Sequence, residues 1–381
     1  MTRRDACLLL DTLRLREAVD DAAARHEWRR ADGRGLAAIV AWEGGAQWLL
    51  RRIVESHLED VAPASLQTLL RKTAIGEQAR CMLVDEQTEE TVRALSAQGI
   101  PHVLIKGSAR RAAAGRYPYA DARATRDVDL LLPKQCVQEV WDDMRRMGWQ
   151  YGTDPAVTPS DHYHPPPLVG PHRVAVELHW STGYAITPEE AWRRANDGAV
   201  ELDWHQVRVR VPSATELLWH GITHALHAGP LGFRLCYFLD GAAILASGAP
   251  IDWDRMAARL AAGEDVDAWV ARAWLRAAAE FSACELPASV RGAAAPFDIA
   301  RALAWRLAVV ARGGAEGLGA RLVEEGTRTE LGLPVASVVE GTGSLTQARR
   351  WVAGRVARLT YRAWRLTARN MAAGRSGCSR V

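Results

Sequence analysis

The sequence predicts an α/β (α+β) fold in which a small mixed-sheet core lies between two helical regions. Apolar residues recur at a spacing near 3.6 before residue 99 and again after residue 212, which is typical of amphipathic helices. Between these regions, short β-branched runs and alternating segments predict strands. The 381 residues are 48% hydrophobic and 24% charged, so the chain has enough apolar material for two or three globular domains.

Within the core, strands are predicted to alternate with helices. The short apolar run at residues 102–105 is a strand that leads through Lys106-Gly107-Ser108 into a helix, because a glycine turn follows it directly. The next elements are a strand at 127–132, a helix at 134–147, a loop at 154–171 that is rich in proline and histidine, and strands at 173–180 and 206–211. This order implies a mixed sheet.

The predicted organisation has four parts. They are an N-terminal helical region, the core, a C-terminal helical domain, and a glycine-rich linker with a basic amphipathic helix, at residues 1–98, 99–212, 213–312 and 313–381. The C-terminal helical domain starts at Ser213, which forms a predicted capping box with Glu216 three residues later.

The end of the chain differs in charge from the rest. Residues 341–381 contain nine arginines and no acidic residue, whereas the other 340 residues carry 39 basic and 45 acidic side chains. The amphipathic helix predicted at 346–371 therefore has two interpretations. It binds an anionic partner such as nucleic acid, an acidic peptide or a membrane surface, or it docks on the acidic body of its own protein.

The cysteines and the N-terminus bear on the compartment. The six cysteines are scattered without a Cys-x-x-Cys pair, so we expect free thiols. No run approaches the roughly 18 to 20 apolar residues of a membrane span, and the N-terminal leucine pattern lacks the cleavage site of a signal peptide. These features predict cytoplasmic residence.

Three acidic residues lie on predicted strands that have an apolar back. Asp127 and Asp129 flank Val128 in one strand, and Glu177 alternates with apolar neighbours in a later one, so each strand has an acidic and a buried face. Carboxylates two residues apart on one face repel each other unless a cation lies between them. If the two strands are neighbours, the acids can hold Mg²⁺ or Mn²⁺, including the paired metals of phosphoryl transfer.

The segment before these acids strengthens the prediction of a site. An isolated Asp-x-Asp is more often the exposed face of an edge strand. Here a strand, a Gly-Ser turn and a helix precede it, and such a turn presents backbone N–H groups to an anion. Lys106 lies at the mouth of the turn and is one of only three lysines among 48 basic residues. The combination predicts a site for a nucleoside triphosphate and a metal ion.

These motifs resemble the DNA polymerase β-like nucleotidyltransferase superfamily. The chain is more similar to an uncharacterised bacterial group of these nucleotidyltransferases, over about residues 60–265. The shared motifs are Leu104-Ile105-Lys106-Gly107-Ser108, Tyr117-Pro118, Arg123, Asp127-Val128-Asp129-Leu130-Leu131, Glu177-Leu178-His179-Trp180 and Phe238-Leu239-Asp240. Two positions depart from the pattern. Lys106 stands where the superfamily usually has a second glycine, and Arg126 stands where the group usually has a small or polar residue.

The resemblance implies a nucleotidyltransferase that uses Mg²⁺ (or Mn²⁺) and an NTP. The catalytic residues and metal ligands that it implies are Asp127, Asp129 and Glu177. The nucleotide-binding residues that it implies are Lys106, Gly107, Ser108 and Arg123. The residues that would border the substrate pocket are His179, His224 and Asp240. The acceptor would be a small molecule, peptide or protein, in a pathway for modified peptides such as lasso peptides.

Other histidines are weaker candidates. His220, His224 and His227 share one helical face at spacing i, i+4 and i+7, which suits a zinc site, but a buried or pocket-lining face explains this spacing as well. His162 and His164 precede three prolines, in a loop that could cover the site or be an ordinary surface loop.

Two alternatives to this function remain open. The acceptor could be RNA held by the basic tail, although the acidic body lacks interleaved aromatic and basic residues. The chain could also be a catalytically silent binding or antitoxin-like module, although such a module has no physical need for three clustered carboxylates.

Overall fold

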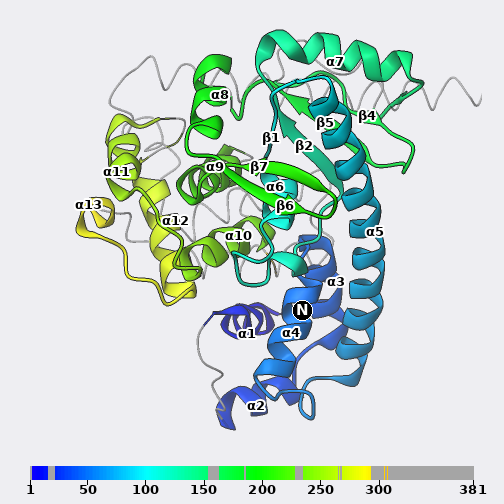
Figure 1. The fold of residues 1–381 in the computed structure, drawn as a ribbon. Coiled ribbons are helices and arrows are strands. Elements are labelled where there is room, and N and C mark those ends of the chain that lie inside the picture. Colours follow the sequence, from blue (N-terminus) through cyan, green and yellow to red (C-terminus); the bar gives the residue numbers. More distant parts are fainter. Residues whose placement is uncertain are drawn as a thin grey trace, which may run out of the picture.

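The computed structural model describes residues 2–15, 22–152, 163–183, 186–227, 235–264, 266, 268–292, 304 and 307. Figure 1 shows a mixed sheet with a bundle of helices on either side of it. The linker and basic helix predicted at 313–381 lie outside the described residues. The prediction of an α/β fold is confirmed, because most of the described chain is helical and its largest sheet contains both parallel and antiparallel pairs.

The N-terminal part is helical, as predicted. Its helices are α1 (Arg3–Leu13), α2 (Ala22–Arg29), α3 (Gly33–Glu43), α4 (Ala46–Glu55) and α5 (Ala64–Ala97). The first four pack together, and α5 runs from them along the sheet (Figure 1). At the start of α1, Thr2 and Asp5 form a capping box, which satisfies N–H groups that a helix end leaves without partners.

The larger sheet has the strand order β1-β2-β5-β4-β3. Its strands are β1 (Val103–Leu104), β2 (Asp127–Leu131), β3 (Gln150–Tyr151), β4 (Leu168–Val169) and β5 (Ala175–His179). The central pair, β2 and β5, is parallel, and the other pairs are antiparallel. The helices α6 (Lys106–Ala112) and α7 (Lys134–Arg146) follow β1 and β2, and a 3₁₀ turn, η1 (Ala120–Ala122), precedes β2.

Two parts of the sheet correct the sequence analysis. Strand β4 lies inside the segment predicted as a loop, and β3 was not predicted. Each has only two residues, which is too short for an alternating pattern to show in the sequence. Their strand geometry depends on pairing, since β4 pairs with β5 and β3 pairs with β4.

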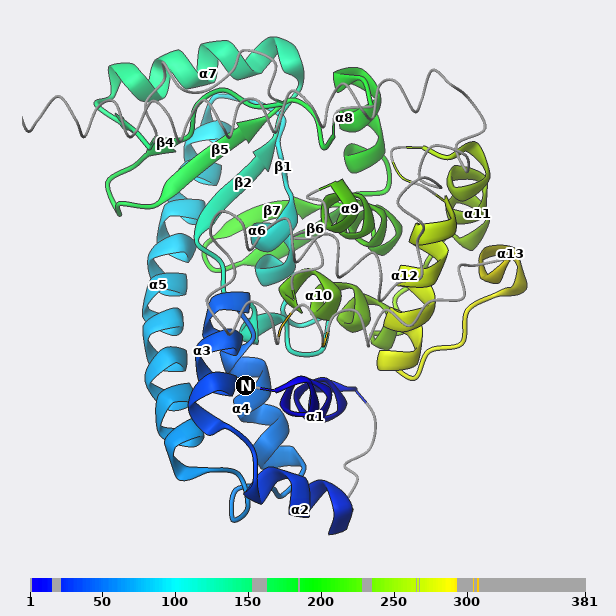
Figure 2. The same ribbon diagram turned by 180° about the vertical axis from the view of Figure 1, so that it is seen from behind.

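A separate hairpin lies beside β1 and is followed by the C-terminal helices. It consists of β6 (Val200–Trp204) and β7 (Val207–Val211), and α8 (Pro188–Asn196) precedes it. Of the two strands, only β7 was predicted. The helices that follow are α9 (Ala214–His227), α10 (Leu235–Ala246), α11 (Trp253–Ala262), α12 (Ala268–Phe281) and α13 (Ala288–Arg291). Figure 2 shows α9 and α10 next to α6 and the hairpin.

The capping box predicted at Ser213 is formed in one direction. The backbone N–H of Glu216 donates to the Ser213 hydroxyl at 3.4 Å. The Glu216 carboxylate instead accepts hydrogen bonds from Arg259 of α11, at 2.7 and 2.9 Å. The capping box would place the Glu216 carboxylate at the start of its own helix. In the structure this carboxylate pairs with the buried Arg259 guanidinium of another helix instead.

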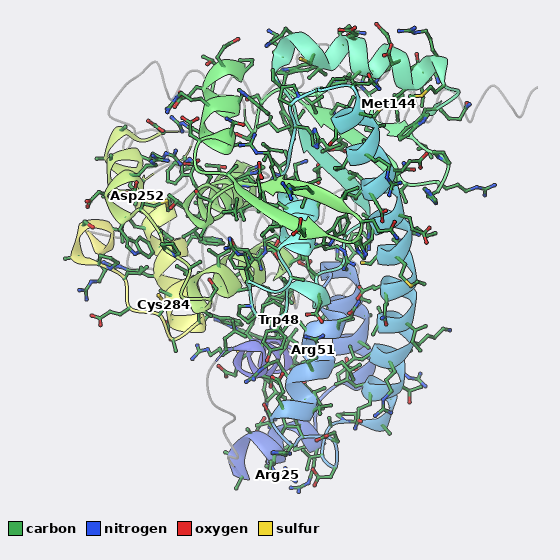
Figure 3. All side chains as sticks on the ribbon, in the orientation of Figure 1. Arg25, Trp48, Arg51, Met144, Asp252 and Cys284 are labelled. Carbon is green, nitrogen blue, oxygen red and sulfur yellow. The ribbon has the colours of Figure 1, made fainter. Side chains whose placement is uncertain are left out.

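The N-terminal helices hold the segment that leads into β2. Figure 3 marks Trp48 and Arg51 on α4. The Trp48 ring stacks on Tyr119 with centroids 4.6 Å apart, and Arg51 pairs with Asp121. Residues 119–126 are thus fixed between α4 and the sheet, and this segment contains side chains of the site described below.

Side chains from all parts of the described chain share one apolar cluster. It includes Leu9 of α1, Leu130 of β2 and Trp274 of α12. The boundaries predicted at 98/99 and 212/213 fall between α5 and β1 and between β7 and α9. The five cysteines among the described residues are free thiols, and no described helix is both long and apolar enough to cross a membrane.

Candidate active site

The parallel pairing of β2 and β5 places two acidic side chains next to each other. In this register Asp129 lies opposite Glu177, and Asp127 lies opposite Ala175. The intervening residues Val128 and Val176 are buried, because alternate side chains of a strand point to opposite faces. The predicted strand faces are therefore present, and Glu177 lies on the strand that neighbours the two aspartates.

Lys106 connects the two acidic strands. Its ammonium donates to Asp129 Oδ1 at 2.7 Å and to Glu177 Oε2 at 3.2 Å. The backbone of Lys106 has φ = 50°, a left-handed conformation that is uncommon for a residue with a side chain and marks functional sites when the surrounding structure enforces it. This bend carries the chain from β1 into α6 and directs the lysine toward the acids.

His179 completes the cluster at the end of β5. Its Nε2 lies 3.0 Å from Asp129 Oδ1, 3.2 Å from Glu177 Oε2 and 3.3 Å from the Lys106 ammonium. The ring is fully buried, and Tyr163 stacks on it at a centroid distance of 5.4 Å. His179, which was predicted to border the pocket, thus contacts the acids directly.

The acids carry more negative charge than their surroundings balance. The pKa of Asp127 is raised to about 7, first by burial and then by the neighbouring Asp129 and Glu177, while Lys106 and Arg123 oppose the shift. Burial would also raise the pKa of Glu177, but the His179 hydrogen bond and the Lys106 charge hold it below its usual range. Asp127 is therefore the acid of this cluster that takes up a proton most readily when no cation is bound.

The donor set fits a divalent cation. Asp127, Asp129 and Glu177 line one cavity beside the Lys106 ammonium, and carboxylate oxygens are the ligands of Mg²⁺ and Mn²⁺. Among the described residues, His164, Glu177 and His179 also form one group whose ligand atoms all lie within 4.8 Å of one another. Since imidazole nitrogen suits transition metals better than Mg²⁺, this second group suits a transition metal where both histidines take part.

The Gly-Ser turn has a structural task that the sequence does not reveal. The Ser108 hydroxyl accepts from the Asp129 N–H at 3.1 Å and lies 3.4 Å from the Asp127 carbonyl, to which it donates. It is buried and ties α6 to β2. A β-carbon on Gly107 would come within 3.0 Å of the Thr125 side chain. Close packing of α6 on the segment before β2 thus explains both residues.

A cavity of about 360 Å³ opens beside the acids, within the range of roughly 300–1,000 Å³ for small-molecule sites. Its lining includes the predicted residues Lys106, Gly107, Arg123, Asp127, Asp129, Glu177, His224 and Asp240. Ser108 and His179 are not part of the lining. Sequence reasoning missed Glu43, Arg110 and Thr125, which also line it. They come from three separate segments, so no local motif connects them.

Arg123 forms its ion pair with Asp240 of α10. Its Nε donates to both Asp240 carboxylate oxygens, at 3.0 and 3.1 Å. Burial by itself would lower the pKa of Arg123, but Asp240 keeps it above its usual range. Asp240 and Arg123, predicted from separate motifs, therefore form one half-buried ion pair that joins α10 to the segment before β2.

The histidines of α9 are arranged along the cavity. His220 and His224 line it, and His224 Nε2 lies 3.0 Å from the Tyr237 hydroxyl. Neither belongs to a three-ligand metal group among the described residues. The side chain of His227 lies outside the described residues, as does His162, so the zinc and loop predictions for these two stay predictions.

A mixed sheet that carries Asp-x-Asp beside a third acid, next to a Gly-Ser turn and an open cavity, places the protein in the nucleotidyltransferase class. The chain belongs to a family described as uncharacterised nucleotidyltransferases, whose model matches residues 29–272. The match begins in α2 and ends in α12, so it includes the whole sheet and the cavity. A comparison with curated proteins found no match.

Proposed function

We propose that the protein is a divalent-metal-dependent enzyme that transfers a nucleoside monophosphate from an NTP to an acceptor. The observation that carries this proposal is the placement of Asp127, Asp129 and Glu177 on neighbouring parallel strands at the wall of a ligand-sized cavity. The family supports an NTP as substrate. Neighbouring carboxylates repel one another and lose hydration when they are partly buried, so they destabilise the fold unless a cation binds between them.

The proposed reaction forms one bond and breaks one bond. An acceptor oxygen attacks the α-phosphorus of the NTP, the bond from that phosphorus to the bridging oxygen of the β-phosphate breaks, and pyrophosphate leaves. The proton of the acceptor hydroxyl passes to a carboxylate of the cluster, for which Glu177 is the candidate. A bound Mg²⁺ or Mn²⁺ would supply positive charge to the attacking and leaving oxygens.

The residues of the chain have distinct tasks in this proposal. The metal ligands are Asp127, Asp129 and Glu177. Lys106 and Arg123 offer positive charge to the phosphates, and the Gly107 backbone borders the space for them. Ser108 acts as a positioning residue, because its hydroxyl fixes the Asp129 backbone.

The acceptor that we propose is a small molecule or peptide, acted on in the cytoplasm. The cavity supports this choice, because its lining combines charged side chains with His224 and Tyr237 around a volume of about 360 Å³. A pathway for modified peptides is one such context.

Label transfer tests the proposal. The full-length protein is incubated with each α-phosphate-labelled NTP, with Mg²⁺ or Mn²⁺ and with peptide and metabolite fractions as acceptors. We expect metal-dependent pyrophosphate release and labelled product. A melting temperature measured with metal and a non-hydrolysable NTP should rise, because ligand at 100 times Kd stabilises a protein by about 2.7 kcal/mol. Absence of both the rise and pyrophosphate release would refute the proposal.

A further inference from the structure

Arg110 is a buried cation in the cavity wall. It lies on α6 one helical turn after Lys106, and its side chain is 3% exposed. It lines the same cavity as the acids. Its Nε, Nη1 and Nη2 atoms have no hydrogen-bond partner within the part of the chain that the structure describes.

The surroundings of Arg110 balance its charge only in part. The nearest carboxylate is Asp240, whose Oδ1 lies 3.8 Å from Arg110 Nε. Both oxygens of that carboxylate already accept from Arg123. The ring of Tyr117 lies 4.5 Å from the Arg110 guanidinium carbon, which contributes a cation–π contact but no hydrogen-bond acceptor. One carboxylate therefore faces two guanidinium groups.

An unpaired buried guanidinium is energetically unfavourable. Removing a charge from water costs several kcal/mol unless a partner and hydrogen bonds replace the water. Burial lowers the pKa of Arg110, and Asp240 opposes this shift. The Arg110 side chain lines the cavity, and its nitrogen atoms lie just behind the cavity surface, out of contact with solvent. A ligand supplies the missing partner when a shift of this side chain brings the guanidinium to the cavity. Its planar fork matches the two oxygens of a carboxylate or phosphate.

We propose that Arg110 binds an oxyanion, carboxylate or phosphate, of the acceptor. This inference rests on the proposed function, because it describes the second substrate of the transfer. The acceptor, rather than the NTP, is the source of the anion because the acidic cluster already has its own cations. Lys106 contacts Asp129 and Glu177 directly. Arg110 lies against Asp240 of α10, beyond the Arg123–Asp240 pair, and has no contact with the acids of β2 and β5 among the described residues.

Two fluorinated anions test this site by ¹⁹F NMR. Monofluorophosphate represents phosphate and trifluoroacetate represents carboxylate, and line broadening reports the affinity of each. Titrations use the full-length protein with Mn²⁺-free Mg²⁺ buffer and a saturating non-hydrolysable NTP. We expect Arg110→Met to weaken binding of at least one anion by about tenfold or more, as for the loss of a buried charge partner. The anion that responds identifies the group on the acceptor.

Arg111 provides the matched control. It is the next residue on α6, and its guanidinium is paired with Asp85 of α5, outside the cavity lining. Arg111→Met should leave both anion affinities unchanged. Melting curves check folding, and Arg110→Gln replaces Arg110→Met if the latter does not fold. Equal anion binding by wild type and the Arg110 variant overturns the proposal.

A second result would also overturn it. If the Arg110 variant loses affinity for the NTP analogue by the same factor, Arg110 belongs to the nucleotide site. Failure of the proposed function is distinguishable, because it appears as absence of analogue binding by the wild-type protein. The anion titrations are therefore repeated without nucleotide. Under these conditions the anion affinities of the wild type and of the Arg110 variant should still differ.

Discussion

The ammonium of Lys106 lies 2.7 Å from Oδ1 of Asp129 and 3.2 Å from Oε2 of Glu177. One lysine thus joins the two strands that carry the acids, and its side chain is only 19% exposed. A divalent cation bound by the same oxygens would compete with this ammonium for them. Lys106 therefore has two places to act, on the carboxylates and on the phosphates of a nucleotide.

Lys106→Met should weaken the fold and strengthen metal binding. Loss of the ammonium leaves buried carboxylates unpaired, so the free energy of unfolding in EDTA should fall by about 3 kcal/mol. Mn²⁺ should raise the melting temperature of the variant more than that of the wild type, because it no longer competes with the lysine. Differential scanning fluorimetry with and without Mn²⁺ measures both effects. An equal Mn²⁺ response in the two proteins would contradict this view of Lys106.

Lys106→Arg should also be harmful, although it keeps the charge. A compact ammonium contacts Asp129, Glu177 and His179 at once, whereas a planar guanidinium is larger and directs its donors differently. We expect lower NTP turnover with a melting temperature between those of wild type and Lys106→Met. Normal turnover by Lys106→Arg would show that only the charge matters there.

Asp129→Asn should abolish transfer while the protein remains folded. The substitution keeps the shape of a side chain that is 2% exposed but removes its charge, so metal binding and transfer should fall by about 100- to 1,000-fold. Pyrophosphate release and label transfer from the α-phosphate-labelled NTP measure the loss, and circular dichroism checks the fold. Asp121→Asn, which changes an acid outside the cluster that pairs with Arg51, is the control and should retain activity. Full activity of Asp129→Asn would remove Asp129 from the catalytic assignment.

Gly107→Ala separates packing from nucleotide binding when it is combined with Thr125→Ala. The new β-carbon would meet Thr125 Cγ2 and Oγ1, both at 3.0 Å, so the single variant should lose about 1–3 kcal/mol of stability through overpacking. Thr125→Ala removes both atoms, and the double variant should recover stability.

Binding of an NTP analogue to the double variant then decides the role of Gly107. We expect it to stay weakened, as measured by calorimetry, because the β-carbon still borders the cavity. Wild-type affinity in a stable double variant would mean that Gly107 serves only the packing of α6.

Glu77→Gln should remove a pH dependence of stability. Glu77 lies on α5, and burial raises its pKa from 4.5 to about 7, with Arg126 and Arg123 opposing the shift. The folded state therefore binds a proton more tightly than the unfolded state, and the free energy of unfolding falls as the pH rises from about 4.5 to 7. Above pH 7 the ionised carboxyl destabilises the wild type by a constant amount.

Urea denaturation in EDTA at pH 5 and pH 8 measures this effect. Because the carboxyl is partly accessible to water, solvent screening reduces it, and we expect Glu77→Gln to be more stable than wild type at pH 8 by about 1 kcal/mol. Glu139→Gln, at an exposed position of α7, should follow the wild-type profile. A Glu77→Gln profile identical to that of the wild type would refute the assignment.

The helices and long strands could be predicted because their patterns are local. The alternation around Asp127 and Asp129 in β2, and around Glu177 in β5, identifies which side chains share a face before any pairing is known. The same reasoning fails for β3 and β4, since two residues do not make a period. It also fails for Glu216, whose carboxylate binds Arg259 of α11 instead of its own helix end.

By itself, the sequence determined the class of fold, the acidic faces of two strands and the turn at Lys106-Gly107-Ser108, because each depends on residues close together in the chain. Tertiary structure alone decided that Asp129 lies opposite Glu177, that Lys106 reaches both, and that Arg123 pairs with Asp240. It also brought Arg110 and Thr125 to the cavity wall. The physical reason is that periodicity encodes which way a side chain faces, whereas its partner depends on strand register and on helices packed from distant parts of the chain.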